Sequence, residues 1–96
     1  MRRPAMTTEE AQAIALAGLA VLADQPERIG RFLSVSGVAP GDIRALAGTA
    51  AFQTAILTHI RADESLLLVF AAQLGVDPAR IGEAEAQLSG NRQPPF

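Results

Sequence analysis

The single histidine, His59, is the first candidate for acid–base or metal chemistry, because imidazole titrates near neutral pH. A metal site needs three or four converging ligands, and no histidine or carboxylate cluster with ligand spacing accompanies His59. Asp63, four residues later, either orients the imidazole or caps the helix expected to follow, and the cap is the favoured interpretation. The chain's serines lack the strand and turn that expose a nucleophile, and they are Ser34, Ser36, Ser65 and Ser89. The sequence therefore predicts no catalytic residue and no metal ligand, and a protein that is not an enzyme.

Cofactor chemistry finds no support in the sequence either. There is no cysteine, which excludes disulfides, thiolate zinc sites and thiol nucleophiles. The glycines are scattered, without the strand that precedes a phosphate-binding loop. The acidic pairs Glu9–Glu10 and Asp63–Glu64 fall where helices are expected to begin, and the helix dipole explains them. We therefore expect no cofactor.

All eight basic residues are arginine, and four of them are candidates for a partner-binding patch. Arginine binds carboxylates in a bidentate geometry that lysine does not offer. A patch on the outer face of the second to fourth helices would bind an anionic tail or surface, whereas the simpler interpretation is a solvated face. The candidate residues are Arg28, Arg31, Arg44 and Arg61.

A helix-turn-helix hairpin that binds nucleic acid is the alternative function. Ala71, Gly75 and Ile81 have the small, glycine and aliphatic spacing of such a hairpin. The segment that would read the groove holds one arginine and two glutamates, whereas groove-reading helices carry basic or amide side chains. The sequence pI near 5.2 also argues against a phosphate-binding surface. Nucleic acid is therefore not the expected partner.

The elements that position these residues are helices, because capping signals and helical spacing recur while alternating strand patterns are absent. Glycines at 37, 48 and 75 mark helix ends, and Pro26, Pro40 and Pro78 mark helix starts. The sequence predicts an all-α compact bundle of five to six short helices. The expected helices run from the Thr7–Glu10 capping box to about Ala23, then over Pro26–Ser36, Pro40 to about Ala47, Ala50–Arg61, Glu64–Leu74 and Pro78 to about Leu88.

An internal repeat with a period of 38 residues indicates two related three-helix units. Independent convergence of two helical hairpins on the same loop residues explains the repeat equally well. Each copy has a phenylalanine, a glycine, a valine, a proline and an isoleucine at matching positions. The first copy holds Phe32, Gly37, Val38, Pro40 and Ile43, and the second holds Phe70, Gly75, Val76, Pro78 and Ile81.

Two helices are apolar on every side, one over Ala13 to Ala23 and one over Leu66 to Ala72. Either their neighbours sheath them completely, or a face remains exposed and binds a partner, which is another protein or a second copy in a homodimer. Burying both helices makes the core sensitive to truncation, Phe70 above all.

The ends of the chain point to a cytoplasmic protein without a membrane span. Met1-Arg2-Arg3 is followed by Pro4 and a polar stretch, unlike a signal peptide, and no apolar run reaches the roughly 18 residues of a span. We expect residues 1–6 and 90–96 to be disordered ends around one domain at 7–89. Met6 is a second candidate for the translation start.

Three segments of the sequence carry a resemblance to a known family, and they are Asp24-Gln25-Pro26-Glu27-Arg28-Ile29-Gly30-Arg31-Phe32-Leu33, Gly37-Val38-x-Pro40-x-Asp42-Ile43-Arg44 and Ala62-Asp63-Glu64-x-Leu66-Leu67-Leu68-x-Phe70-Ala71. Together they resemble a short alphaproteobacterial family catalogued as Domain of Unknown Function 3572. The resemblance covers roughly residues 9–88 and implies a small helical cytoplasmic bacterial protein, with no activity, substrate or site attached, so it leaves the function open. From the residues themselves, the expected function is a non-catalytic protein–protein interaction module.

Overall fold

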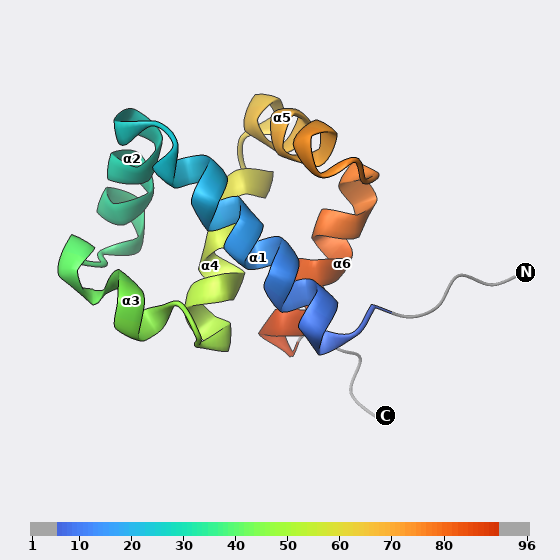
Figure 1. Ribbon diagram of the computed structural model, residues 1–96, viewed down its shortest axis with the longest axis horizontal. Coiled ribbons are helices and arrows are strands. Elements are labelled where there is room, and N and C mark those ends of the chain that lie inside the picture. The colour runs from blue at the N-terminus through green and yellow to red at the C-terminus, as the bar shows by residue number, and fades with distance from the viewer. Residues whose placement is uncertain (1–5, 91–96) are drawn as a thin grey trace, which may run out of the picture.

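The computed structural model describes residues 6–90, and it is an all-α bundle, as the sequence predicts. In Figure 1, α1 crosses α4, with α2 and α3 on one side and α5 and α6 on the other. The helix boundaries match the expected ones within a residue at all but the third helix. The elements are α1 Thr8–Ala23, α2 Pro26–Ser36, the 3-10 turn η1 Pro40–Asp42, α3 Ile43–Leu46, α4 Ala50–Arg61, α5 Glu64–Leu74 and α6 Pro78–Ser89.

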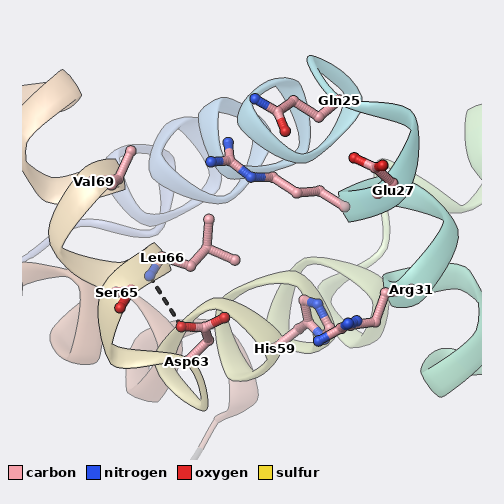
Figure 2. Close-up of a pocket in the computed structure, with 9 residues that line it drawn as sticks. Gln25, Glu27, Arg31, His59, Asp63, Ser65, Leu66 and Val69 are labelled. Atoms are coloured by element: carbon pink, nitrogen blue, oxygen red, sulfur yellow. Dashed lines mark hydrogen bonds between the residues drawn. The ribbon is translucent and has the colours of Figure 1, made fainter.

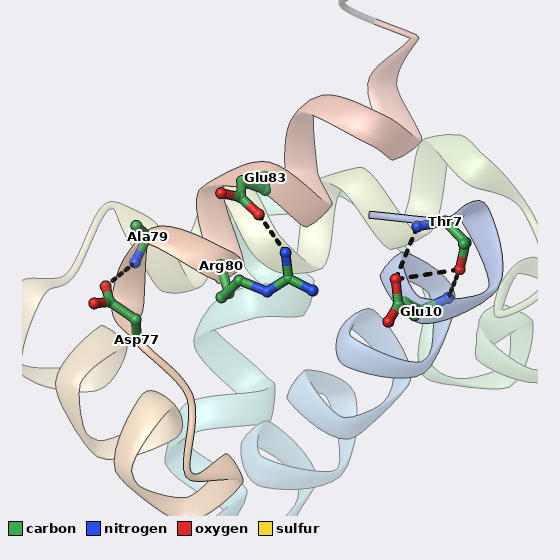
Figure 3. Close-up of polar contacts among 6 residues, drawn as sticks. All are labelled: Thr7, Glu10, Asp77, Ala79, Arg80 and Glu83. Atoms are coloured by element: carbon green, nitrogen blue, oxygen red, sulfur yellow. Dashed lines mark hydrogen bonds and ion pairs between the residues drawn. The ribbon is translucent and has the colours of Figure 1, made fainter. Parts of the chain in front are cut away.

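Side-chain caps begin four of these helices. Thr7 and Glu10 form the predicted capping box, in which Thr7 Oγ1 accepts from the Glu10 amide at 3.0 Å and Glu10 Oε1 accepts from the Thr7 amide at 2.9 Å (Figure 3). Asp77 Oδ1 accepts from the Ala79 amide at 2.8 Å at the start of α6 (Figure 3). Thr49 and Asp63 cap α4 and α5 in the same way. These short-range bonds explain why local sequence signals locate the helix starts.

The third predicted helix is wrong in its first turn. Instead of one helix from Pro40 to about Ala47, a 3-10 turn is closed by the Asp42 amide donating to the Ala39 carbonyl at 2.9 Å, and only Ile43–Leu46 is α-helical. Gly41, the residue after the starting Pro40, has a low helix propensity, and a tight 3-10 turn is common at the N-terminus of a helix. The Gln53 side chain donates to the Ala47 carbonyl at 2.9 Å and closes the segment against α4.

The core lies where α1, α4 and α6 meet, with Phe32 of α2 and Phe70 of α5 inserted from the two sides. Met6, expected to belong to a disordered N-terminal end, is buried against this core. The rest of the predicted ends, 1–5 and 91–96, lies outside the described residues. The largest fully buried side chains are Leu22, Phe32, Gln53, Ile56, Leu57, Ile60, Phe70 and Ile81.

The internal repeat is visible in the structure of the loops, but the third helices of the two halves differ. Gly37 and Gly75 both end a helix with a left-handed φ, of 76° and 70°. Phe32 and Phe70 are both buried. The third helices differ, because α3 has four residues at the periphery and α6 has twelve residues in the core.

The two apolar helices leave apolar side chains exposed. In α1 the buried residues Ala11, Ala15, Gly18 and Leu22 form one stripe, while Leu16 is 43% exposed. In α5, Leu68 and Val69 are 51% and 39% exposed. The neighbouring helices therefore do not sheath α1 and α5 completely. Within residues 6–90 no single helix has the length and apolarity to cross a membrane. Only α5 and α6 taken together reach that length and apolarity, and the two helices are bent by 98° relative to each other.

Candidate partner-binding surface

A cavity of about 250 Å³ opens between the start of α2, the end of α4 and the first turns of α5. Figure 2 shows Glu27 and Arg31 of α2 across the opening from Ser65, Leu66 and Val69 of α5. Its walls carry charged groups and its α5 side is partly apolar. The lining residues are Gln25, Glu27, Arg28, Arg31, His59, Asp63, Ser65, Leu66 and Val69.

The helical repeat of α2 brings the two arginines into this cavity. Arg28, Arg31 and Val35 are spaced i, i+3, i+7, so they share one edge of the helix, while Phe32 beside them is buried. Pro26 starts the helix one residue after the Gln25 cap position and thereby sets this register. The ion pairs among residues 6–90 are Arg61–Glu85 and Arg80–Glu83, so neither Arg28 nor Arg31 is paired with a carboxylate there.

His59, in the last turn of α4, lies between α2, which carries the two arginines, and the start of α5. Its ring packs edge-on against Phe32 with centroids 5.3 Å apart. Burial lowers the pKa of His59 below 6.5, the Arg31 guanidinium lowers that pKa further, and the Asp63 carboxylate opposes both. Burial and the Arg31 charge therefore favour the neutral form of the imidazole over the imidazolium. Asp63 Oδ1 accepts from the Leu66 amide at 3.2 Å, which confirms the predicted cap.

The charges of Arg31 and Asp63 lead to a testable prediction for the pKa of His59. Arg31→Gln should raise the pKa of His59, and Asp63→Asn should lower it, because each removes a charge that acts on the imidazolium. Arg44→Gln, on α3, is the control and should leave the titration unchanged. Proton NMR of the imidazole measures all three, and an unaltered pKa in Arg31→Gln would contradict the assigned geometry.

The same shift has a consequence for stability. Since the folded pKa of His59 lies below the unfolded value of 6.5, the unfolded chain binds the proton more readily. The contribution of the neutral His59 to the free energy of unfolding is therefore fully present above pH 6.5. It is lost as the pH falls from 6.5 through the pKa of His59 in the folded protein.

A second concavity, of about 410 Å³, continues from His59 along the two helices, and we call it the α2–α4 groove. The α4 side consists of small residues that recur at helical spacing from Ala51 to Ala62. The α2 side carries Val35, which is 73% exposed. His59 belongs to both concavities, so the charged cavity adjoins one end of the apolar groove. The groove residues are Phe32, Val35, Ser36, Ala51, Thr54, Ala55, Thr58, His59 and Ala62.

The four arginines expected to form one patch are divided. Arg28 and Arg31 lie together in the cavity. Arg61 instead pairs with Glu85 of α6, with its guanidinium against Gly82, and Arg44 is exposed on α3. Arg61 sits in the last turn of α4, where the helical repeat turns it toward α6 rather than toward α2. The expected patch is thus reduced to two of its members.

Sequence reasoning did not identify the groove. Its signal is weak, because a stripe of Ala51, Ala55 and Ala62 with threonines between them is equally typical of a helix packed against a neighbour. Val35 is a single apolar residue between Ser34 and Ser36, and nothing local marks it as part of a surface.

The hairpin that suggested nucleic-acid binding places its second helix in the core. In α6, Ile81, Ala84 and Leu88 are buried against α1 and α4. Arg80, the one arginine of this helix, is paired with Glu83 at 2.6 Å (Figure 3). Thr58 and Arg61 of α4 bind the Glu85 carboxylate. The charged residues of α6, which are Arg80, Glu83 and Glu85, are therefore all engaged in ion pairs or hydrogen bonds.

The described residues thus form a small all-α bundle whose most chemically distinctive surface is the cavity and groove along α2. Within residues 6–90, no three histidine or acidic side chains converge on a metal-sized site, and His59 and Ser65 share no hydrogen bond. The chain belongs to the family described as Protein of unknown function (DUF3572), whose profile matches residues 8–91. No curated protein matches the chain, and no solved structure matches it.

Proposed function

We propose that this protein is a non-catalytic, cofactor-free interaction module of the cytoplasm that binds another protein chain through the α2–α4 groove and the adjoining cavity. The observation that carries the proposal is Val35, 73% exposed on the rim of an apolar groove. Solvent contact with such a groove is unfavourable, and a partner's apolar side chains would remove that surface from water.

The charges beside the groove support protein over nucleic acid as the partner. Two guanidinium groups without carboxylate partners among the described residues, at one end of an apolar groove, suit a protein surface that combines apolar anchors with a carboxylate. Phosphate binding requires many basic groups along one face, whereas the helix that would read a groove in DNA carries one arginine, Arg80, which is paired with Glu83.

A photoreactive amino acid at position 35 tests this proposal in the native cell. We expect a discrete cross-linked protein from position 35, competed by excess wild-type protein but not by the Val35→Glu variant. The matched control is a photoreactive residue at Leu16, an apolar side chain of similar kind exposed on α1. Identical products from both positions, or none from position 35, would overturn the proposal.

A further inference from the structure

The outer face of α5 has the complementary features of the α2–α4 groove. Glu64, Leu68 and Ala72 are spaced i, i+4, i+8 and are all exposed, with Val69 beside them. Leu68 is 51% and Val69 39% exposed. The opposite side of α5 packs into the core through Leu66 and Phe70, so the outer face is free to make contacts without α5 leaving the bundle.

The dimensions of the two surfaces agree. The small-residue stripe of α4 from Ala51 to Ala62 spans eleven helical steps, or about 16 Å. The eleven residues of α5 span about the same length. Alanines and threonines on the α4 side leave room in the groove for another helix to approach closely, while Leu68 supplies an apolar side chain to fill it.

The charges agree as well. With Leu68 and Ala72 directed toward Val35 and Ala51, the N-terminal end of the helix lies toward the arginine end of the groove. Glu64, in the first turn of α5, then faces Arg28 and Arg31. No ion pair among the described residues uses Glu64 or either arginine, so the contact costs no existing pair.

The placement of the two surfaces allows both contacts to form at once. Figure 2 shows the cavity lined by α2 and the end of α4 on one side and by α5 on the other. The groove adjoins the first side through His59, which lines both concavities, and α5 bounds the second side. A two-fold axis near the cavity would place each copy's α5 on the other copy's groove, which gives a closed dimer rather than an open chain.

We infer that the α2–α4 groove is filled by α5 of a second copy of this chain, with Glu64 of one copy on Arg28 and Arg31 of the other. This inference rests on the proposed function, since it names the occupant of the same surface. The contact is a small one between two helices, so we expect a reversible dimer with a dissociation constant on the order of micromolar.

Sedimentation velocity over a range of concentrations tests the inference with purified protein. Wild-type protein should pass from monomer to dimer. Val35→Glu and Leu68→Glu should each weaken the dimer by about a hundredfold, because each places a charge in an apolar contact. Leu16→Glu, the control on α1, should leave the dissociation constant unchanged. Circular dichroism shows whether each variant retains its helices.

A charge exchange tests the pairing itself. Arg31→Glu and Glu64→Arg should each weaken the dimer by about tenfold, and the double variant should regain most of that affinity. A monomer at every concentration, or a dimer unaffected by Val35→Glu, would overturn the inference, as would a double variant no tighter than the singles. The first of these leaves the proposed function standing if position 35 still cross-links to a different protein, and overturns both if it does not.

Discussion

Replacing Phe70 with alanine is expected to lower the free energy of unfolding by about 3–5 kcal/mol, enough to unfold much of a small domain. The ring is 0% exposed and inserts from α5 toward α1, where a Cβ atom on Gly18 would lie 3.4 Å from its Cζ atom. Truncation removes the contacts that hold α5 to the rest of the bundle and leaves a cavity that the surrounding helices fill only in part.

Urea denaturation followed by far-UV circular dichroism measures this loss, since the chain has no tryptophan or tyrosine to report by fluorescence. Leu68→Ala is the matched control on the same helix, because Leu68 is half exposed in the monomer. At concentrations where the protein is monomeric, its effect should stay within about 0.5 kcal/mol. An urea midpoint in Phe70→Ala equal to that of wild type would mean that Phe70 lies outside the core.

Alanine at two helical glycines should change stability in opposite directions. At Gly18, a Cβ would lie 2.8 Å from Ile60 Cδ1 and 3.1 Å from Ile56 Cγ2, both of which belong to fully buried side chains. Overpacking of this kind costs about 1–3 kcal/mol, more than the roughly 1 kcal/mol that alanine gains over glycine in a helix. At Gly30 of α2 a Cβ meets nothing within 4 Å, so Gly30→Ala should stabilise the fold by up to about 1 kcal/mol.

The clash at Gly18 can be isolated with Ile60→Val, which removes the Cδ1 atom that the new Cβ would meet. Ile60→Val alone should cost about 0.5–1.5 kcal/mol. Gly18→Ala together with Ile60→Val should cost less than the two changes added, which thermal or urea unfolding of the four proteins measures. Additive losses would show that α1 and α4 separate to admit the methyl group.

Local signals in the sequence predict most of the helices because helix ends are made by neighbouring residues. Thr7, Asp63 and Asp77 bond to amides two or three positions ahead, and Gly37 and Gly75 take the left-handed conformation one step past a helix. The segment that starts at Pro40 differs, because its end is held by Gln53, which donates to the Ala47 carbonyl from six residues further along the chain.

Burial on the apolar helices is not readable from their sequence. In α1 the buried Ala15 and the exposed Ala13 are the same residue type, so no periodicity separates core from surface. The tertiary contact with Ile56 and Ile60 decides which face of α1 lies inward, because only Gly18 allows α4 to come so close.

The sequence predicts only part of the candidate site, because helix geometry positions some of its residues and tertiary packing positions the others. Arg28 and Arg31 share a helix edge, so their proximity follows from local geometry. Arg61 and Arg44 depend on how α4 and α3 pack, and Arg61 is drawn to Glu85 twenty-four residues later. The groove itself exists only in the assembled bundle, where α2 meets α4 mainly through Phe32, leaving Val35 beside an open stripe of small residues.

Isotope-filtered NMR on a mixture of labelled and unlabelled protein tests most directly whether the α2–α4 groove is a docking surface. We expect intermolecular contacts between the methyl groups of Val35 and those of Leu68 at concentrations where the dimer is populated, and none from the methyl groups of Leu16. Intermolecular contacts that involve Leu16 but spare Val35, or no contacts from Val35 to any bound chain, would contradict the assignment of this surface.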